Sequence, residues 1–244
     1  MDNPIGKNDI IRLSHLHDGA ALLIDKPSGW TSFDVVNKLR WAIRTKLGVK
    51  KYKVGHAGTL DPLATGLLII CISKFTKKIE GYVGQSKSYI GEVEFFKTTP
   101  TYDAEMLPDC YYPVQDFSRS GIQNAANTYL GEIQQRPPIF SALKKNGVPM
   151  YKLARKGKDV DIPTRAVTIH NYEVRAYQNG VADISVVCSK GTYIRSLAYD
   201  LGQSLETGAY LRSLRRTAIG EYSVEDAWEL DKVITSVNEI SLQE

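Results

Sequence analysis

Residues 55–66, GHAGTLDPLATG, form the most constrained stretch of this 244-residue chain. Glycines at 55, 58 and 66 permit positive φ and close backbone approach, whereas Pro62 restricts Asp61 to extended conformations. The stretch is therefore predicted to be a shaped loop that presents Asp61 as its one carboxylate. The apolar run that follows it, residues 67–72, is typical of a buried strand.

The segments on either side of this loop predict a mixture of strands and helices. Residues 20–25 predict a strand, and Thr31 or Ser32 is a suitable N-cap for a helix with apolar residues at 35, 36, 39, 42 and 43. Residues 89–96 alternate as a half-buried strand does, and Asn179-Gly180 predicts a hairpin between strands at 167–177 and 181–188. Helices are predicted at 118–129, around 150–156 and at 193–205, and a long loop at 98–117.

These elements follow no regular βαβ order, so the predicted fold class is α+β, with a largely antiparallel mixed sheet flanked by helices. No repeat, low-complexity linker or sharp compositional boundary divides the chain. We therefore expect a single domain over residues 1–244, with a core that spans about residues 20–228.

Charge is unevenly distributed along the chain. The whole chain carries +4 and residues 221–244 carry −6, so the first 220 residues carry +10. Seven lysines and arginines and no acid lie between residues 35 and 60, and further basic clusters lie at 144–158 and 212–216. A solvated face explains any one cluster, whereas three together favour a polyanionic partner such as a nucleic acid.

Composition excludes several classes of protein. Three cysteines far apart indicate neither a disulfide framework nor a zinc site, and the longest apolar run is too short to cross a membrane. No signal-peptide stretch, histidine cluster, phosphate loop or dinucleotide fingerprint is present in the sequence. We therefore expect a soluble cytoplasmic monomer that uses no membrane, metal or cofactor.

Asp61 and Arg195 are the main candidates for chemistry. Asp61 is either a turn-capping side chain or a reactive carboxylate, and the spacing leaves both open, as it does for His56. Arg195 lies in the first turn of a predicted helix, where a cation opposes the helix dipole, so an anion is expected nearby. Either Arg195 is solvated, or it pairs with a carboxylate in a pocket and keeps that carboxylate ionised.

Six segments resemble, in order and spacing, the TruB family of tRNA pseudouridine synthases. They are residues 21–30 (ALLIDKPSGW), 55–66, 87–89 (KSY), 135–155 (QRPPIFSALKKNGVPMYKLAR), 189–195 (SKGTYIR) and 211–216 (LRSLRR). The resemblance implies the pseudouridine synthase fold and the isomerisation of uridine to pseudouridine in the T-loop of tRNA, at position 55. The target nucleotide is expected to flip out into a pocket, because the enzyme must reach an atom hidden in folded RNA.

Residue roles are implied by the same resemblance. Asp61 is the implied catalytic aspartate and Arg195 its ion-pair partner, whereas Tyr89 stacks on the target uracil. Leu214 and Tyr193 line the pocket. Four further residues are implied to contact RNA, namely His56 in the space that the flipped nucleotide leaves, and Lys144, Lys145 and Arg216 at phosphates.

The sequence departs from longer family members at two places. Only sixteen residues follow Trp228, so the C-terminal RNA-binding PUA domain is expected to be missing, and the tRNA contacts are expected at the T-arm. Residues 98–106 (TTPTYDAEM) end on Met106 where the family has glycine, so Asp103 receives no role from the resemblance.

Two other functions are compatible with the same residues. A non-catalytic tRNA-binding protein or tRNA folding chaperone explains the basic clusters and Tyr89, but gives no reason for Asp61 in an apolar loop. An aspartate-nucleophile hydrolase acting on a small phosphorylated substrate explains Asp61, but the sequence offers no grouped metal ligands for it.

Overall fold

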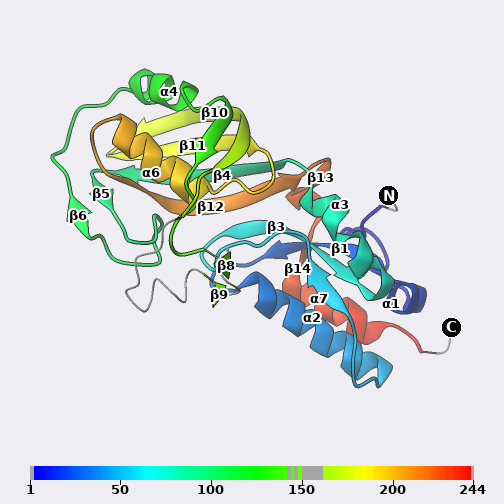
Figure 1. The fold of residues 1–244 in the computed structure, drawn as a ribbon. Coiled ribbons are helices and arrows are strands. Elements are labelled where there is room, and N and C mark those ends of the chain that lie inside the picture. Colours follow the sequence, from blue (N-terminus) through cyan, green and yellow to red (C-terminus); the bar gives the residue numbers. More distant parts are fainter. Residues whose placement is uncertain (1–2, 142–143, 146–147, 150–161, 243–244) are drawn as a thin grey trace. The chain divides into compact units, whose positions relative to one another are not determined.

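The computed structural model describes residues 3–141, 144–145, 148–149 and 162–242. The chain forms two compact units, which we name the terminal unit, residues 1–89 and 215–244, and the central unit, residues 90–214 (Figure 1). Two strands, β4 (Lys87–Phe95) and β12 (Ala209–Ile219), contribute residues to both units.

The terminal unit is a layered arrangement of strands and helices. Its other elements are α1 (Leu13–Asp18), β1 (Ala20–Lys26), α2 (Ser32–Leu47), β2 (Val54–His56), β3 (Thr65–Ile72), the 3-10 helix η1 (Ser73–Lys78), α3 (Ile79–Val83), β13 (Tyr222–Ser223), the 3-10 helix η2 (Val224–Asp226), β14 (Trp228–Glu229) and α7 (Leu230–Glu239). The strand order is β14-β1-β3-β12, with β2 also paired to β3 and β13 to β12. The β1–β14 and β3–β12 pairs are parallel and the others are antiparallel, so the sheet is mixed.

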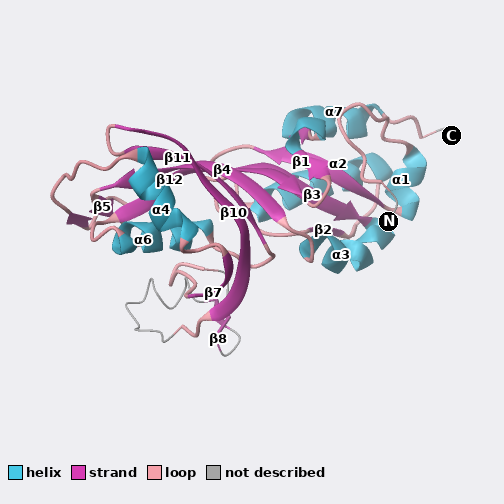
Figure 2. Cartoon of the chain, turned by 90° about the horizontal axis from the view of Figure 1, so that it is seen from above, coloured by secondary structure: helices cyan, strands magenta, loops and turns pink. Residues whose placement is uncertain are grey.

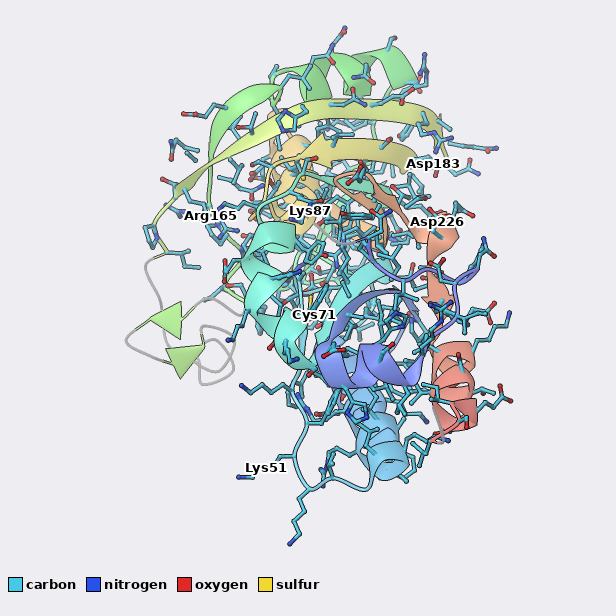
Figure 3. The ribbon with its side chains drawn as sticks, turned by 90° about the vertical axis from the view of Figure 1, so that its right-hand side faces the viewer. Lys51, Cys71, Lys87, Arg165, Asp183 and Asp226 are labelled. Carbon is cyan, nitrogen blue, oxygen red and sulfur yellow. The ribbon has the colours of Figure 1, made fainter. Side chains whose placement is uncertain are left out.

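Both faces of the β1–β3 pair are covered, which explains why these strands are continuous apolar runs. On one face, alternate residues such as Leu22 and Ile70 pack with apolar residues of α1, α2 and α7. On the other face, Leu23, Ile69 and Cys71 pack with Tyr82 of α3, and Figure 3 shows Cys71 among the packed strands. The predicted strands at 20–25 and 67–72 are confirmed.

Helix α2 begins and ends as its sequence predicts. The Thr31 side chain accepts a hydrogen bond from the Asp34 backbone N–H, and the Thr31 N–H donates to the Asp34 carboxylate, which completes a capping box. Gly48, in the left-handed region with φ of 66°, ends the helix. The buried residues of α2 include every apolar position that the helical spacing identified.

The described part of the central unit combines a sheet, in which β11 and β7 both pair antiparallel with β10, with the helices α4 and α6. Its remaining elements are β5 (Lys97–Thr98), β6 (Cys110–Tyr111), α4 (Arg119–Asn127), β7 (Gly131–Gln135), β8 (Lys144–Lys145), β9 (Val148–Pro149), β10 (Arg165–Gln178), β11 (Val181–Cys188) and α6 (Ile194–Ser204). The strand order is β12-β4-β11-β10-β7, and α4 packs on β10 and against α6. The hairpin predicted at Asn179-Gly180 is confirmed, since both residues have the positive φ of a type I′ turn.

Strand β10 is long and curved, as Figure 2 shows. Its pairing with β11 shifts register after Ile169 and again after Val174. Such β-bulges bend a strand and increase its twist, so they account for the curvature.

The predicted α+β class, with a largely antiparallel mixed sheet flanked by helices, is confirmed. The segment predicted as a long loop differs in detail, because a two-stranded ribbon of β5 and β6 lies within it. The helix expected around residues 150–156 falls outside the described residues.

Candidate active site

Asp61 lies in the predicted loop, between the end of β2 and the start of β3, and its side chain is half-buried. The loop is shaped by Gly58 and Gly66, whose φ values are 107° and 104°. A Cβ on Gly66 would lie 2.2 Å from the backbone oxygen of Arg216 in β12, so only glycine permits this close strand pairing. The backbone at the end of the loop is thus packed directly against the backbone of β12.

Arg216 holds the loop on the side that precedes Asp61. Its side chain is 1% exposed, and its guanidinium donates from Nε to the Leu67 carbonyl (2.7 Å), from Nη2 to Gly58 (3.1 Å) and from Nη1 to Thr59 (3.4 Å). Five donors in a fixed fork suit such a cluster of carbonyls. The phosphate contact expected of Arg216 stays a prediction; in the structure its guanidinium is buried and bound to the protein backbone.

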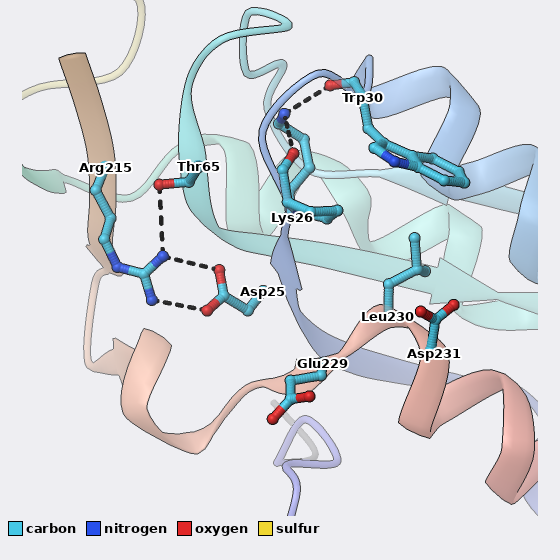
Figure 4. A pocket seen from close by; sticks show the side chains of 9 residues that line it. Asp25, Lys26, Trp30, Thr65, Arg215, Glu229, Leu230 and Asp231 are labelled. Atoms are coloured by element: carbon cyan, nitrogen blue, oxygen red, sulfur yellow. Dashed lines mark hydrogen bonds and ion pairs between the residues drawn. The ribbon is translucent and has the colours of Figure 1, made fainter.

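Lys26 holds the loop on the side that follows Asp61. Its fully buried ammonium donates to the carbonyls of Pro27 (2.9 Å) and Trp30 (2.6 Å), seen in Figure 4, and to that of Pro62 (3.2 Å). Burial lowers the pKa of Lys26 to about 8, and the negative charge of Asp61 acts in the opposite direction. Lys26 received no role from the sequence, and its position in the segment 21–30 (ALLIDKPSGW) was the available signal.

The loop is further connected to the N-terminus of α2. Ser32 Oγ accepts a hydrogen bond from the Leu60 N–H at 2.8 Å and lies 3.2 Å from the Leu60 carbonyl, to which it donates. The Gly29 N–H donates to the Pro62 carbonyl at 2.9 Å. Backbone groups on both sides of Asp61 are therefore anchored to different elements, which fixes the position of its carboxylate.

His56 is half-buried at the end of β2. Burial lowers its pKa, and the positive charge of Arg216 lowers it further, so both favour the neutral imidazole. A neutral imidazole adds no second charge to the loop.

A cavity of about 400 Å³ lies beside the loop in the terminal unit, lined among others by Lys26, Trp30 and Arg215 (Figure 4). Arg215 forms a two-pronged ion pair with Asp25, at 3.0 and 2.7 Å, and lies 3.4 Å from Thr65 Oγ1. Like Arg216, this guanidinium is thus engaged within the protein.

In the central unit, Arg195 is buried in the first turn of α6. Its Nη1 and Nη2 donate to the carbonyls of Thr101 (3.0 Å) and Phe140 (3.1 Å), and its Nε lies 3.6 Å from Oδ2 of buried Asp103. Asp103 also accepts a hydrogen bond from the Glu105 N–H, which orients its carboxylate. Asp103 is an anion of the kind expected beside Arg195, at a position to which the sequence assigned no role.

Tyr193 is the N-cap of α6 and is half-buried. Its backbone N–H and carbonyl are bound by the side-chain amide of Gln135, at 2.8 and 3.0 Å. The centre of its ring lies 4.6 Å from the guanidinium carbon of Arg165 and 6.0 Å from that of Arg195. The ring is therefore held at the start of the helix that carries Arg195.

The remaining candidates are placed as follows. Tyr89 is buried on β4 within the terminal unit, and Leu214 is half-buried on β12 within the central unit. Lys144 and Lys145 form β8, paired with β9, and their side chains lie outside what the structure describes. The Asp61–Arg195 ion pair would join residues of the two units and stays a prediction.

Among the described residues, no group of three or more histidine, cysteine or acidic side chains is arranged to hold a metal ion. Within the same residues, no helix is both long enough and apolar enough to span a bilayer.

Comparison with known proteins identifies the family. Residues 44–194 match the model of the TruB family pseudouridylate synthase N-terminal domain, and residues 195–242 match that of the tRNA pseudouridylate synthase B C-terminal domain. The chain belongs to the TruB family. It is accordingly an isomerase of the pseudouridine synthase class.

Relatives of high identity support this membership of the TruB family. The tRNA pseudouridine synthase B of Flavobacterium johnsoniae is 50% identical over 214 residues, covering 87% of this chain and 93% of the relative. That of Phocaeicola vulgatus is 47% identical, covering 88% and 91%.

Solved structures show the same fold. A Cbf5-Nop10-Gar1 complex contains a chain 26% identical, with a TM-score of 0.67 over 96% of this chain. An H/ACA RNP bound to a substrate RNA containing 2′-deoxyuridine contains one 24% identical, with a TM-score of 0.65 over 96% of this chain. This chain spans 61% and 60% of those two chains.

Proposed function

We propose that this TruB-family chain converts uridine to pseudouridine in the T-loop of tRNA, at position 55, with Asp61 as the catalytic carboxylate. The observation that carries the proposal is the anchoring of the Asp61 loop by two buried cations, Lys26 and Arg216. Relatives named tRNA pseudouridine synthase B, 50% and 47% identical, support tRNA as the substrate.

The chemistry suits a fixed, ionised carboxylate. The reaction breaks the bond between uracil N1 and ribose C1′, turns the base and joins C5 to C1′, so substrate and product are isomers and no external reductant or oxidant is consumed. A group that acts at C1′ or C6 must be charged and held in place, because misplacement by about 1 Å can cost 100-fold in rate. The positive charge of Lys26 favours the ionised form of Asp61, and the anchored carbonyls of Gly58, Thr59 and Pro62 restrict the loop.

Other residues have supporting roles in this proposal. Arg195 is the ion-pair partner of Asp61, and its burial with Asp103 supports a role that depends on a fixed guanidinium. Tyr89 stacks on the flipped uracil, a contact that contributes about 1–3 kcal/mol and offsets part of the unstacking cost. Tyr193 and Leu214 wall the pocket. The contacts proposed with the remaining RNA are those of His56, Lys144 and Lys145.

For Arg216, burial supports a different role from the one that the sequence suggested. Its guanidinium orients the loop that presents Asp61, and we assign it as a positioning residue. We further propose that the chain acts in the cytoplasm, as a monomer, on the T-arm of tRNA.

The Asp61→Asn variant tests the catalytic assignment. Asparagine keeps the shape of the side chain but cannot carry the charge, so we expect turnover on unmodified tRNA transcript to fall by about 1,000-fold or more. Binding of the same RNA should stay within about threefold of the wild type, because the carboxylate does not attract a polyanion. The measurement maps new pseudouridine by base-specific chemical probing, and filter binding gives Kd.

Asp183, exposed on β11, provides the matched control. Asp183→Asn should retain wild-type turnover. Retained activity in Asp61→Asn would reject Asp61 as the catalyst, and pseudouridine at a uridine outside the T-loop would reject the proposed position. RNA binding without any turnover by the wild-type chain would favour the RNA chaperone.

A further inference from the structure

The outer face of α2 and the loop after it expose aromatic and basic side chains together. We name it the α2 face; its residues are Phe33, Lys38, Trp41, Arg44, Lys50 and Lys51. The opposite side of the helix carries Val35, Leu39 and Ile43, which are fully buried in the terminal unit. Helix packing therefore accounts for the buried side and leaves the α2 face unexplained.

The aromatic residues of this face are unusually open. Trp41 is 62% exposed and Phe33 is 59% exposed, and both lie on the side of α2 opposite its core contacts. The guanidinium of Arg40 lies 5.9 Å from the Phe33 ring, which places a cation beside an exposed aromatic surface. Exposed rings interleaved with cations are the composition of sites that bind unpaired nucleotides, where bases stack on the rings.

The charge of the α2 face is not neutralised within the protein. In the part of the chain that the structure describes, no carboxylate lies within ion-pair distance of its four lysines and arginines. Two lysines elsewhere in the terminal unit do have ion-pair partners, since Lys74 pairs with Asp18 and Lys232 with Glu229, at 2.9 and 2.7 Å. One acid, Asp34, is exposed in the first turn of α2, and its carboxylate is bound by the Thr31 N–H and hydroxyl in the capping box. The four unpaired cations of the α2 face therefore complement a phosphate backbone.

The α2 face starts at the candidate active site and leads away from it. Ser32, the first residue of α2, is hydrogen-bonded to Leu60, the neighbour of Asp61. Sixteen helical residues rise by about 24 Å in total, so Lys50 and Lys51, beyond the far end of α2, lie roughly that far from Ser32. Figure 3 shows Lys51 in the loop after α2, projecting away from the ribbon.

We propose that the α2 face is a second RNA-binding surface, which holds a part of the substrate RNA remote from the target uridine. Lys38, Arg44, Lys50 and Lys51 contact phosphates, and Trp41 stacks on an unpaired base. The proposal rests on the proposed function, because it assumes that the substrate is a structured RNA larger than the target loop.

Two RNAs and three variants test the proposal. Full-length tRNA transcript and a minimal T-arm hairpin are compared for Kd with Lys50→Ala/Lys51→Ala, Trp41→Ala and Trp41→Phe. For full-length tRNA we expect the double variant to weaken binding about tenfold and to reduce the slope of log K against log[salt] by about 1.5, for two lost phosphate contacts. Trp41→Ala should weaken binding at least about fivefold, and Trp41→Phe should restore most of it, since a ring remains.

The control is Lys74→Ala/Lys232→Ala, which removes the same charge from two exposed lysines of the same unit. It should stay within about twofold of the wild type. The loss of RNA affinity in the test variants should be larger for full-length tRNA than for the hairpin, because the α2 face is proposed to contact RNA beyond the T-arm loop.

The proposal would be overturned if Lys50→Ala/Lys51→Ala and Lys74→Ala/Lys232→Ala weakened tRNA binding equally. It would also be overturned if Lys50→Ala/Lys51→Ala and Trp41→Ala both bound tRNA with the Kd of the wild type. It would also be overturned if Trp41→Ala abolished self-association of the chain in sedimentation while RNA affinity stayed unchanged. Turnover by the wild type is measured separately, so a chain that binds through the α2 face yet makes no pseudouridine would contradict the proposed function alone.

Discussion

Three arginines that are close neighbours in β12 differ in their burial and in the groups that they contact. Arg212 is exposed and lies 3.8 Å from the Glu92 carboxylate, Arg215 is clamped by Asp25, and Arg216 is enclosed by the backbone of the catalytic loop. From the sequence they form one basic cluster. The free energy of desolvating a guanidinium is large, so only one with enough acceptors remains buried.

The Arg216→Lys variant tests the positioning role. Lysine keeps the charge but cannot donate in a fork to the carbonyls of Gly58, Thr59 and Leu67, so the loop loses anchors. We expect kcat to fall about 10- to 100-fold, because the Asp61 carboxylate is displaced, whereas KM changes less than about threefold. Steady-state kinetics on tRNA transcript, at a temperature where circular dichroism shows both proteins folded, provide the measurement.

Arg212→Lys is the control for this prediction, since Arg212 is exposed and should retain wild-type kcat. If Arg216→Lys lowered only the unfolding temperature and left kcat unchanged, the residue would be structural and its positioning role would be wrong.

The sequence predicted the location of Asp61 better than its surroundings. The glycines and Pro62 define a loop from local backbone chemistry alone, and the observed positive φ values confirm that reading. The burial of Lys26 and Arg216 depends on carbonyls contributed by a distant segment, and no local pattern encodes such contacts. The same limit applies to Asp103, whose partner Arg195 is remote in sequence.

At the scale of elements, α6 carries a half-buried carboxyl group, Asp200, beside its buried apolar stripe. Apolar spacing predicted the helix, and Leu197, Ala198 and Leu201 are fully buried. Asp200 lies beside this stripe, and burial raises its pKa to about 6. A carboxyl group whose ionised form is disfavoured by burial lowers the stability of the folded state near neutral pH.

The Asp200→Asn variant measures this cost. Since its pKa in the folded state exceeds the unfolded value, the folded chain retains a proton between about pH 4 and pH 6 that the unfolded chain has released. The contribution of Asp200 to the free energy of unfolding therefore falls as pH rises through this window and stays low above it. Asparagine does not titrate. As pH rises from 4 to 7, we therefore expect the free energy of unfolding of the variant to increase by about 1–3 kcal/mol relative to that of the wild type. Urea unfolding at several pH values tests this.

The exposed Asp183→Asn variant is again the comparison, and its difference from the wild type should vary little with pH. If the free energies of unfolding of Asp200→Asn and the wild type differed by the same amount at every pH between 4 and 7, Asp200 would not be the carboxyl group whose pKa burial raises.

Elements with a strong local period were predicted, and those without one were not. Apolar runs and caps identify β1, β3, α2 and the β10–β11 hairpin. Strand β12 was not predicted, because its arginines interrupt the alternation and are satisfied only by tertiary contacts. Strands β5 and β6 have two residues each, too few for a period, which explains why their segment resembled a loop.

On the scale of the whole chain, the two compact units are not sequential segments. The terminal unit includes both ends of the chain, and the boundaries fall within β4 and β12. A boundary inside a strand leaves no glycine- or proline-rich linker, so composition cannot reveal it. The single domain expected from the sequence stays a prediction.

The uneven charge of the whole molecule predicts how RNA binding and turnover respond to salt. The first 220 residues carry +10 and the last 24 carry −6, so the basic part should release counterions when it binds RNA. We expect Kd for tRNA to rise at least about tenfold between about 50 and 200 mM monovalent salt, whereas kcat at saturating RNA changes little. The chemical step should resist salt because the charges that hold the Asp61 loop are buried, where screening is weak. Asp61→Asn gives Kd without interference from turnover, and unfolding midpoints at both salt concentrations control for stability. A Kd that is independent of salt would contradict a phosphate-based interface, and a kcat that falls in parallel with affinity would contradict buried anchoring of the catalytic loop.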